Sequence, residues 1–136
     1  DRWLAARRRG DINRIQPLIR LPASPLRKLR PNRWKGCKTC NLGVWREDLL
    51  RVNGMDENYA GWGLEDSDLV IRLLRAGVKH KSARFAAPVL HLWHRERDKS
   101  RLAENRRHLE DILQSSRTAA ARGLDQYLQD SKTSPP

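Results

Sequence analysis

The sequence predicts an α/β fold that is rich in helices and has a few short strands. Apolar residues recur at helical spacing over residues 65–76 and again over residues 100–116, which predicts two amphipathic helices. Side chains alternate over residues 37–45, which indicates a half-buried strand. The 136 residues, of which 38% are hydrophobic, suffice for one small domain with a modest core.

Residues 1–34 form a basic N-terminal segment that ends in a proline-rich loop. Residues 1–38 hold 12 Lys or Arg against two Asp, a charge of +10, so most of the formal net charge of +12 lies here. A short basic helix is expected over residues 1–10, and three prolines favour an extended loop over residues 22–34. The sequence allows two interpretations of this region: a solvated linker or a segment that binds anions.

The loop carries cationic side chains on both sides of Trp34. Arg binds phosphate oxygens through two parallel hydrogen bonds, so these side chains would suit a diphosphate, an anionic glycolipid or a membrane surface. The candidate residues are Arg27, Lys28, Arg30, Arg33 and Lys35.

After the strand over residues 37–45, a helix is expected over residues 46–52, ended by an Asn-Gly pair. The buried face of the strand would carry Cys40, Leu42 and Val44.

Residues 61–69 are the most informative stretch of the chain, with the sequence Gly-Trp-Gly-Leu-Glu-Asp-Ser-Asp-Leu. Three carboxylates lie at the start of the helix expected over residues 65–76, where unpaired backbone N–H groups stabilise negative charge. Helix capping alone would explain these acids. It would not require the glycine-flanked tryptophan, however, and a flat aromatic ring beside carboxylates suits a sugar.

Short strands are expected over residues 78–82 and 85–90, the second at a sheet edge because it contains a proline. The helix over residues 100–116 has a narrow apolar stripe, and residues 117–130 should hold a further short helix before a disordered tail over residues 131–136. The chain thus divides into residues 1–34, 35–99, 100–130 and 131–136.

Three blocks in one order carry a resemblance to a known family: Asn41 to Leu49, Val52 to Glu57, and Gly61 to Leu69. Together they resemble the C-terminal part of bacterial inverting glycosyltransferases of the GT-A fold, the family-two type with a galactosyltransferase-like C-terminal region. The resemblance covers residues 35–99. It implies the C-terminal half of a GT-A fold, helix-rich because most strands of the mixed sheet would lie in a nucleotide-binding half upstream.

This resemblance implies transfer of a sugar from a nucleotide-sugar donor to a glycan or glycolipid acceptor, with inversion, in surface polysaccharide or lipopolysaccharide synthesis. Asp66 matches the general base of the family. The acceptor would be held by Trp62, Gly63, Glu65 and Asp68. Leu64 departs from the glycine often found in the family and Ser67 departs from an acid, which leaves the identity of the acceptor open.

The resemblance also implies a divalent cation, Mn²⁺ or Mg²⁺. His94 matches a metal ligand that follows the last core strand, and His91 lies where a second ligand is sometimes found. The other metal ligands would be an acid of the upstream half, the donor diphosphate and water. Without the resemblance, two histidines at a strand end indicate a structural role, and a single C-x-x-C at residues 37–40 indicates reduced cysteines.

The competing hypothesis is a basic module without catalytic activity that binds nucleic acid or an anionic membrane through residues 1–38. It leaves residues 61–69 unexplained, so we favour the transferase and not nucleic-acid binding. No apolar run is long enough to span a membrane and no signal peptide is visible. A cytoplasmic location, with peripheral attachment to the inner face of the membrane, is therefore expected.

Overall fold

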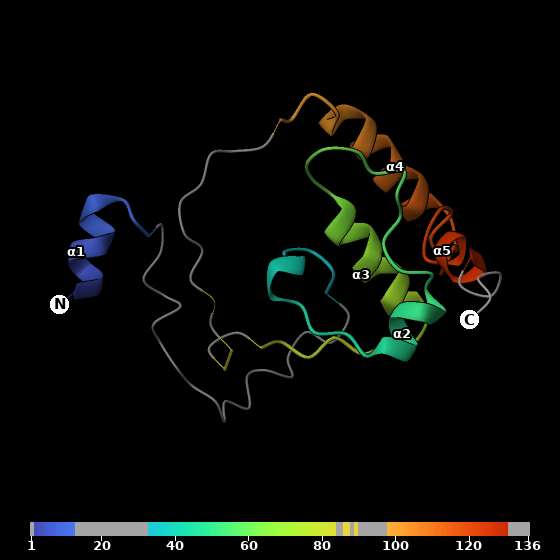
Figure 1. Cartoon of the computed structure of the whole chain (residues 1–136), viewed down its shortest axis with the longest axis horizontal. Coiled ribbons are helices and arrows are strands. Elements are labelled where there is room, and N and C mark those ends of the chain that lie inside the picture. Colours follow the sequence, from blue (N-terminus) through green and yellow to red (C-terminus); the bar gives the residue numbers. More distant parts are fainter. Residues whose placement is uncertain (1, 13–32, 84–85, 88, 90–97, 131–136) are drawn as a thin grey trace. The chain divides into compact units, whose positions relative to one another are not determined.

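The computed structural model describes residues 2–12, 33–83, 86–87, 89 and 98–130. The chain divides into two compact units, Asp1–Pro31 with His80–Glu96 and Asn32–Lys79 with Arg97–Pro136. The first unit contains α1 (Arg2–Arg9) (Figure 1). The elements of the second unit are the 3₁₀-helix η3 (Thr39–Asn41), α2 (Arg46–Arg51), α3 (Glu65–Arg75), α4 (Leu102–Gln114) and α5 (Asp125–Asp130).

All five predicted helices are confirmed, because each expected range contains an α-helix. α3 ends where the sequence predicts: Ala76 is its C-cap, and Gly77 follows in the left-handed region with φ 87°. α2 ends in the same way: Val52 is its C-cap, and Asn53, with φ 60°, and Gly54, with φ 69°, follow in the left-handed region.

The strand expected over residues 37–45 is not present in the structure. η3 replaces its middle, and Cys40 is exposed although we expected it on the buried face. The rest of the segment keeps the predicted alternation, since Leu42 and Val44 are half-buried while Gly43 and Trp45 are exposed. A strand requires a hydrogen-bonded neighbour, and the described residues provide none, so the mixed sheet stays a prediction.

Residues 78–82 are also irregular in the structure, although we expected a strand there. Half of the residues of the strand expected over 85–90 lie outside the described residues, and the described Ala86 and Ala87 are in a turn. Most of the loop over 22–34 and the whole tail over 131–136 also lie outside the described residues.

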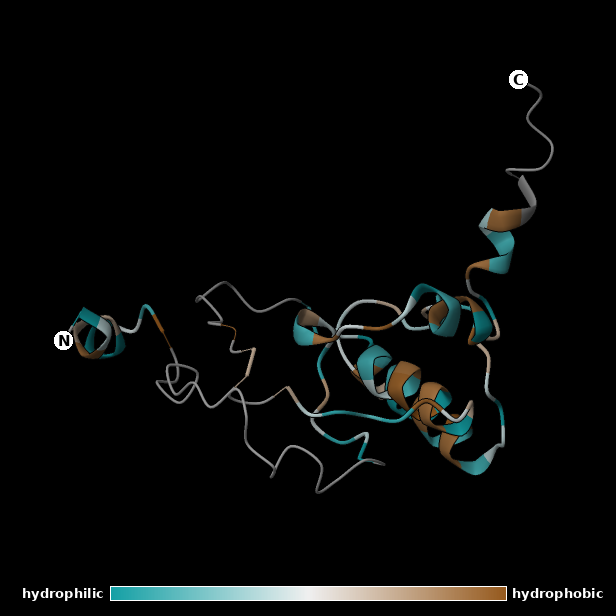
Figure 2. Ribbon diagram, turned by 90° about the horizontal axis from the view of Figure 1, so that it is seen from below, coloured by the Kyte–Doolittle hydropathy of each residue, from teal (hydrophilic) through white to brown (hydrophobic). Residues whose placement is uncertain are grey.

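The second unit is built around α3, which contributes to two apolar clusters. Leu69 and Leu73 pack with Val52, which follows α2, while Ile71 packs with Leu109 and Ile112 of α4. Figure 2 shows hydrophobic residues gathered on the helices of this unit. Each such side chain contributes about 1.5–3 kcal/mol on full burial, so these clusters fix α3 between α2 and α4.

Polar contacts attach the C-terminal segment to the turn after α2. Asn53 accepts a hydrogen bond from the Asp125 backbone at 2.8 Å, and buried Asp56 accepts one from the Ala121 backbone at 2.9 Å. Gly123 lies so close that a Cβ atom there would stand 1.9 Å from the Asn53 carbonyl oxygen. The C-terminal segment is therefore part of the second unit.

Candidate active site

The loop before α3 has an unusual backbone. Gly61, Gly63 and Leu64 have positive φ angles of 72°, 104° and 79°. Glycine adopts such angles without strain, but a leucine there costs about 1–2 kcal/mol. Leu64 packs against the cluster of Ile71, Leu109 and Ile112, and this contact offsets the strain. The structure thus explains how leucine is tolerated at a position where a glycine was expected from the resemblance.

Asp66 is half-buried in the first turn of α3 and faces the segment that leads into η3. Its Oδ1 atom accepts a hydrogen bond from the Thr39 backbone at 3.0 Å. No hydrogen bond to its Oδ2 atom comes from the part of the chain that the structure describes. One oxygen is therefore held in place by the backbone. The contact with Thr39 had no signal in the sequence.

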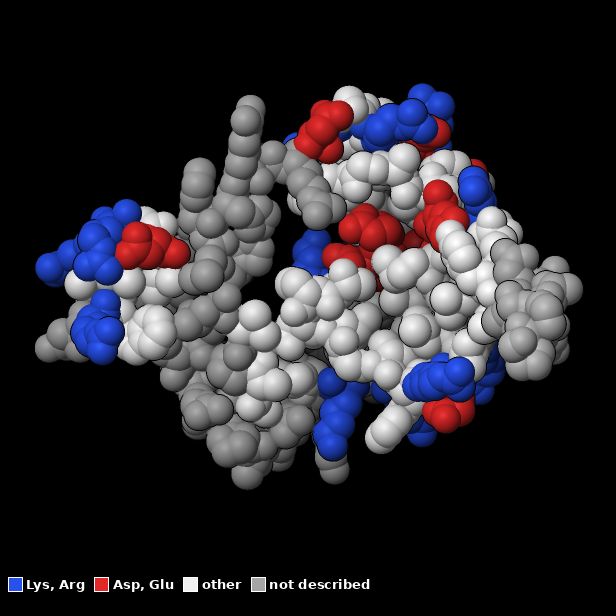
Figure 3. Space-filling model, in the orientation of Figure 1, with Lys and Arg blue, Asp and Glu red and all other residues white. Residues whose placement is uncertain are grey.

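Trp62 and Glu65 lie on either side of the turn that begins α3. Trp62 keeps 42% of its surface exposed, and the Lys99 ammonium lies 5.1 Å from the centre of its ring. Glu65 is half-buried, as is Gly63. Figure 3 shows acidic side chains gathered on this face of the unit, near the start of α3. An exposed indole next to carboxylates is an arrangement that can bind a sugar.

Asp68 does not lie with these residues, which corrects the prediction that it contacts the acceptor. Its side chain is wholly buried, and its Oδ2 atom accepts a hydrogen bond from Arg72 Nε at 2.8 Å. Arg72 also donates to the carbonyl oxygens of Val52 and Gly54, at 2.6 and 2.8 Å. Asp68 is therefore a structural residue that holds the arginine connecting α3 to the end of α2.

Asn105, on α4, is a further residue of the site that the sequence did not indicate. It is 1% exposed and is hydrogen-bonded to the backbone of Ala60, Trp62 and Gly63. The only sign of its burial in the sequence was that a polar residue lies among Leu102, Leu109 and Ile112 of the apolar stripe. The spacing along the helix did not show which loop Asn105 contacts.

Tyr59 places a buried hydroxyl next to this loop. Its ring packs against His108 with the ring centres 5.6 Å apart, and its hydroxyl has no hydrogen-bond partner among the described residues. Burial raises the pKa of Tyr59 above its ordinary value, and the charges of Asp68 and Asp56 raise it further. The hydroxyl therefore stays protonated at neutral pH.

Most of the other predicted ligand-binding residues lie outside the described part of the chain. This holds for His91, His94, Arg27, Lys28 and Arg30. Arg33 and Lys35 are described and exposed; Arg33 Nε donates to the Lys35 carbonyl oxygen at 3.0 Å, and the Lys35 ammonium lies 5.4 Å from the Trp34 ring centre. Their predicted role at a phosphate or an anionic surface stays a prediction.

Cys37 lies close to the Asp66 side of the site. Burial raises the pKa of its thiol, the positive charge of Arg33 lowers it and the negative charge of Asp66 raises it. A thiol that is held protonated in this way is a weak nucleophile and a weak metal ligand. The described residues contain no group of three His, Cys, Asp or Glu side chains that could hold a metal ion.

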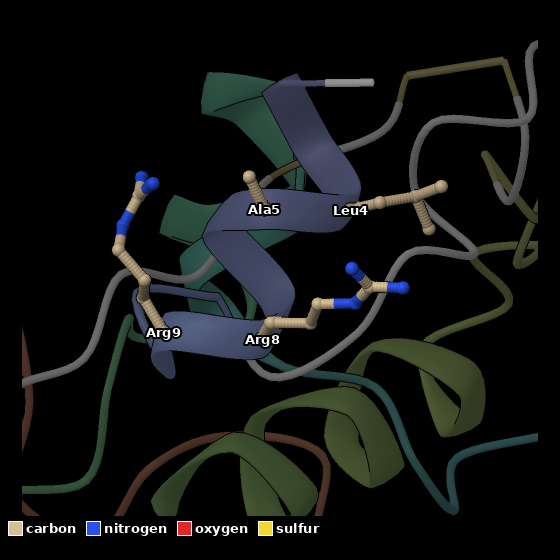
Figure 4. A pocket seen from close by; sticks show the side chains of 4 residues that line it. All are labelled: Leu4, Ala5, Arg8 and Arg9. Carbon is tan, nitrogen blue, oxygen red and sulfur yellow. The ribbon is translucent and has the colours of Figure 1, made fainter.

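An open depression lies on α1 in the first unit. Its described lining consists of Leu4, Ala5, Arg8 and Arg9, and the side chains of Leu4 and Arg8 extend to the same side of the helix (Figure 4). None of the residues predicted to bind the acceptor lines it. No helix in the described residues is long and apolar enough to cross a membrane.

Comparison with known proteins places the site within one family. A family model described as the N-terminal domain of galactosyltransferase matches residues 26–95, which are 70 of the 136 residues. The match contains the loop over residues 61–64 and the start of α3. Its description names an N-terminal domain, whereas we expected a C-terminal region, so the place of this domain in a longer protein stays a prediction. No solved structure matches the chain. The chain belongs to this galactosyltransferase family and is a glycosyltransferase domain.

Proposed function

We propose that this domain binds the acceptor and supplies the general base of an inverting sugar transfer, with Asp66 as that base. The observation that carries the proposal is the position of Asp66. Thr39 holds one of its carboxylate oxygens, and the other receives no hydrogen bond from the described residues. A general base must lie within hydrogen-bond reach of the hydroxyl that it deprotonates, and the contact with Thr39 supports this role because it orients the carboxylate through one oxygen only.

The proposed reaction is a single displacement at the anomeric carbon of the donor. The acceptor hydroxyl oxygen forms the new bond to this carbon while the bond to the nucleoside diphosphate breaks, and the bonding electron pair leaves with the diphosphate. The proton of the hydroxyl passes to Oδ2 of Asp66. Because attack and departure occur on opposite faces of the sugar, the configuration inverts.

Two further residues are proposed to hold the acceptor, which we take to be a glycan or a glycolipid. Trp62 is 42% exposed and its indole ring suits the C–H face of a sugar, and Glu65 accepts hydrogen bonds from the hydroxyl groups of the sugar. Gly63 leaves room at the loop, although a Cβ atom there would already stand 3.3 Å from Leu102 Cδ1. A role in surface polysaccharide or lipopolysaccharide synthesis fits such an acceptor and rests on the family resemblance.

A mutation of the tryptophan tests the acceptor site. Trp62→Ala should raise the acceptor KM by about 10-fold, which corresponds to about 1.4 kcal/mol of lost stacking, with little change in kcat. Nucleoside diphosphate release by the complete protein, with a panel of nucleotide-sugars and p-nitrophenyl glycosides, measures both constants. Trp45→Ala is the matched control, since Trp45 is 79% exposed beside α2 and distant in sequence from this loop. An equal effect of the two changes would contradict the proposal.

We also propose that His94, and to a lesser degree His91, binds Mn²⁺ or Mg²⁺ in the complete protein. A divalent cation would neutralise negative charge on the departing diphosphate. His94→Ala should weaken Mn²⁺ binding, measured by electron paramagnetic resonance with nucleoside diphosphate present, and should raise the Mn²⁺ concentration needed for turnover. His91→Ala should have the smaller effect. Unchanged Mn²⁺ binding by both variants would contradict this assignment.

A further inference from the structure

Asn105 of α4 is the only fully buried residue with an amide side chain in the part of the chain that the structure describes, and the hydrogen bonds of this side chain go to one loop. Its Oδ1 atom accepts a hydrogen bond from the Ala60 backbone at 3.3 Å. Its Nδ2 group donates to the carbonyl oxygens of Ala60 and Gly63, both at 3.0 Å, and to that of Trp62 at 3.4 Å. An amide side chain has two donor hydrogens and one acceptor oxygen, and both its donor group and its acceptor oxygen bond to this loop.

The loop over residues 60–63 needs such a partner. Positive φ angles at Gly61 and Gly63 turn the backbone away from helix and strand geometry, so its carbonyl groups have no regular partners. Buried carbonyl groups without a partner are costly. Asn105 satisfies three of them at once, and this selects one conformation of the loop.

The first turn of α4 completes the support. A Cβ atom at Gly61 would stand 3.7 Å from Arg101 Cβ, and one at Gly63 would stand 3.3 Å from Leu102 Cδ1. The Lys99 ammonium, just before α4, lies over the Trp62 ring. The residues that shape the loop therefore come from residues 99–105, outside the range matched by the family model.

We infer that Asn105 is a positioning residue for sugar transfer: it fixes the loop that presents Trp62 to the acceptor. This inference rests on the proposed function of Trp62 and Asp66. Asn105 does not touch the acceptor. It acts through the backbone of residues 60–63, and through Leu64 this backbone leads directly into the turn that carries Asp66.

Only the asparagine side chain supplies this set of contacts at this length. Aspartate would keep an oxygen that accepts the hydrogen bond of the Ala60 amide. Its other carboxylate oxygen, however, would lie against the carbonyl oxygens of Ala60 and Gly63, which repel it. Alanine would leave three carbonyl groups without a donor. Both substitutions should release the loop while α4 keeps its apolar contacts through Leu109 and Ile112.

The test is Asn105→Ala and Asn105→Asp in the complete protein, below the melting temperature of each variant. We expect kcat/KM for a p-nitrophenyl glycoside acceptor to fall about 10- to 100-fold, as a misplacement of about 1 Å in a site can cause. An unchanged acceptor kcat/KM would overturn the inference.

Leu73→Ala is the control, because Leu73 is buried in the other core cluster, with Val52 and Leu69, and not in the cluster that Leu64 packs against. It should lower the melting temperature at least as much as Asn105→Ala but leave the acceptor KM unchanged. If Leu73→Ala raised the acceptor KM as much as Asn105→Ala did, general destabilisation would explain both, and the inference would be wrong.

Hydrogen exchange in the parent protein tests the same inference, and it requires neither a sugar acceptor nor a variant. In the parent protein the Ala60 amide should exchange as slowly as the amides in the middle of α4, because Asn105 accepts its hydrogen bond. Exchange of the Ala60 amide at the rate of an open loop would overturn the positioning role. If the Ala60 amide is protected but Asp66→Asn leaves sugar transfer unchanged, Asp66 is not the base, whereas Asn105 still fixes the loop over residues 60–63.

Discussion

Asp66 and Asp68 stand two positions apart at the start of α3 and have different environments. Successive residues of a helix are separated by about 100°, so these two side chains leave the helix on nearly opposite sides. Asp68 falls beside Leu69 and faces the core, where Arg72 neutralises it, whereas Asp66 faces the segment around Thr39. Because Asp68 and Arg72 are four positions apart, their pairing has a signal in the sequence that we did not use.

Asp68→Asn should destabilise the protein strongly. It leaves the Arg72 guanidinium buried with no charge to balance it, and breaking a buried ion pair from one side costs about 3–5 kcal/mol. Urea denaturation measures the free energy of unfolding. Asp48→Asn, which breaks the partly exposed pair with Arg51, is the control and should cost about 0–1 kcal/mol. A loss below 1 kcal/mol for Asp68→Asn would show that Arg72 reaches solvent.

Among the elements, the segment from Val52 to Asp56 has a structural role that its polar sequence does not show. It receives Arg72 from α3 and, at Asn53 and Asp56, the backbone of the C-terminal segment. These contacts are made largely by backbone groups and so depend on close approach, which explains why glycine stands at position 123.

Gly123→Ala tests this docking. The new Cβ atom would stand 1.9 Å from the Asn53 carbonyl oxygen, so the two segments must separate, at a cost of about 1–3 kcal/mol or more. Gly43→Ala is the control, because nothing lies within 4 Å of its new atom, and it should change the free energy of unfolding by less than about 0.5 kcal/mol. Similar melting temperatures for the two variants would mean that the C-terminal segment is not docked as described.

α3 and α4 were predictable because each has an apolar stripe, and the end of α3 was predictable from Gly77. The strand over residues 37–45 was not, because alternation reports which side chains are buried and not whether a neighbouring strand exists. Within the site, Trp62, Gly63, Glu65 and Asp66 were found as one motif. Asn105 and Thr39 could not be found, because each meets the motif across a distance of 27 residues or more in the sequence.

At the scale of the whole molecule, the described residues of the candidate site lie in the second unit and come from two separate stretches of the chain. One contains η3, the loop and the start of α3, and the other begins at Lys99 and continues through α4. The family match ends at residue 95, so it includes residues 61–69 but not residues 99–105, which hold the loop in place. We expect acceptor binding to depend on both stretches.

The central claim is that Asp66 is the base of the transfer, and one substitution tests it most directly. Asp66→Asn keeps the size of the side chain and an oxygen for the Thr39 backbone, so the melting temperature should stay close to that of the parent. Turnover of the complete protein with nucleotide-sugar and acceptor should fall by about 10²- to 10⁴-fold. Glu65→Gln should affect the acceptor KM more than kcat. Transfer by Asp66→Asn at close to the parent rate would contradict the account and leave Asp66 as no more than a residue of the first helical turn.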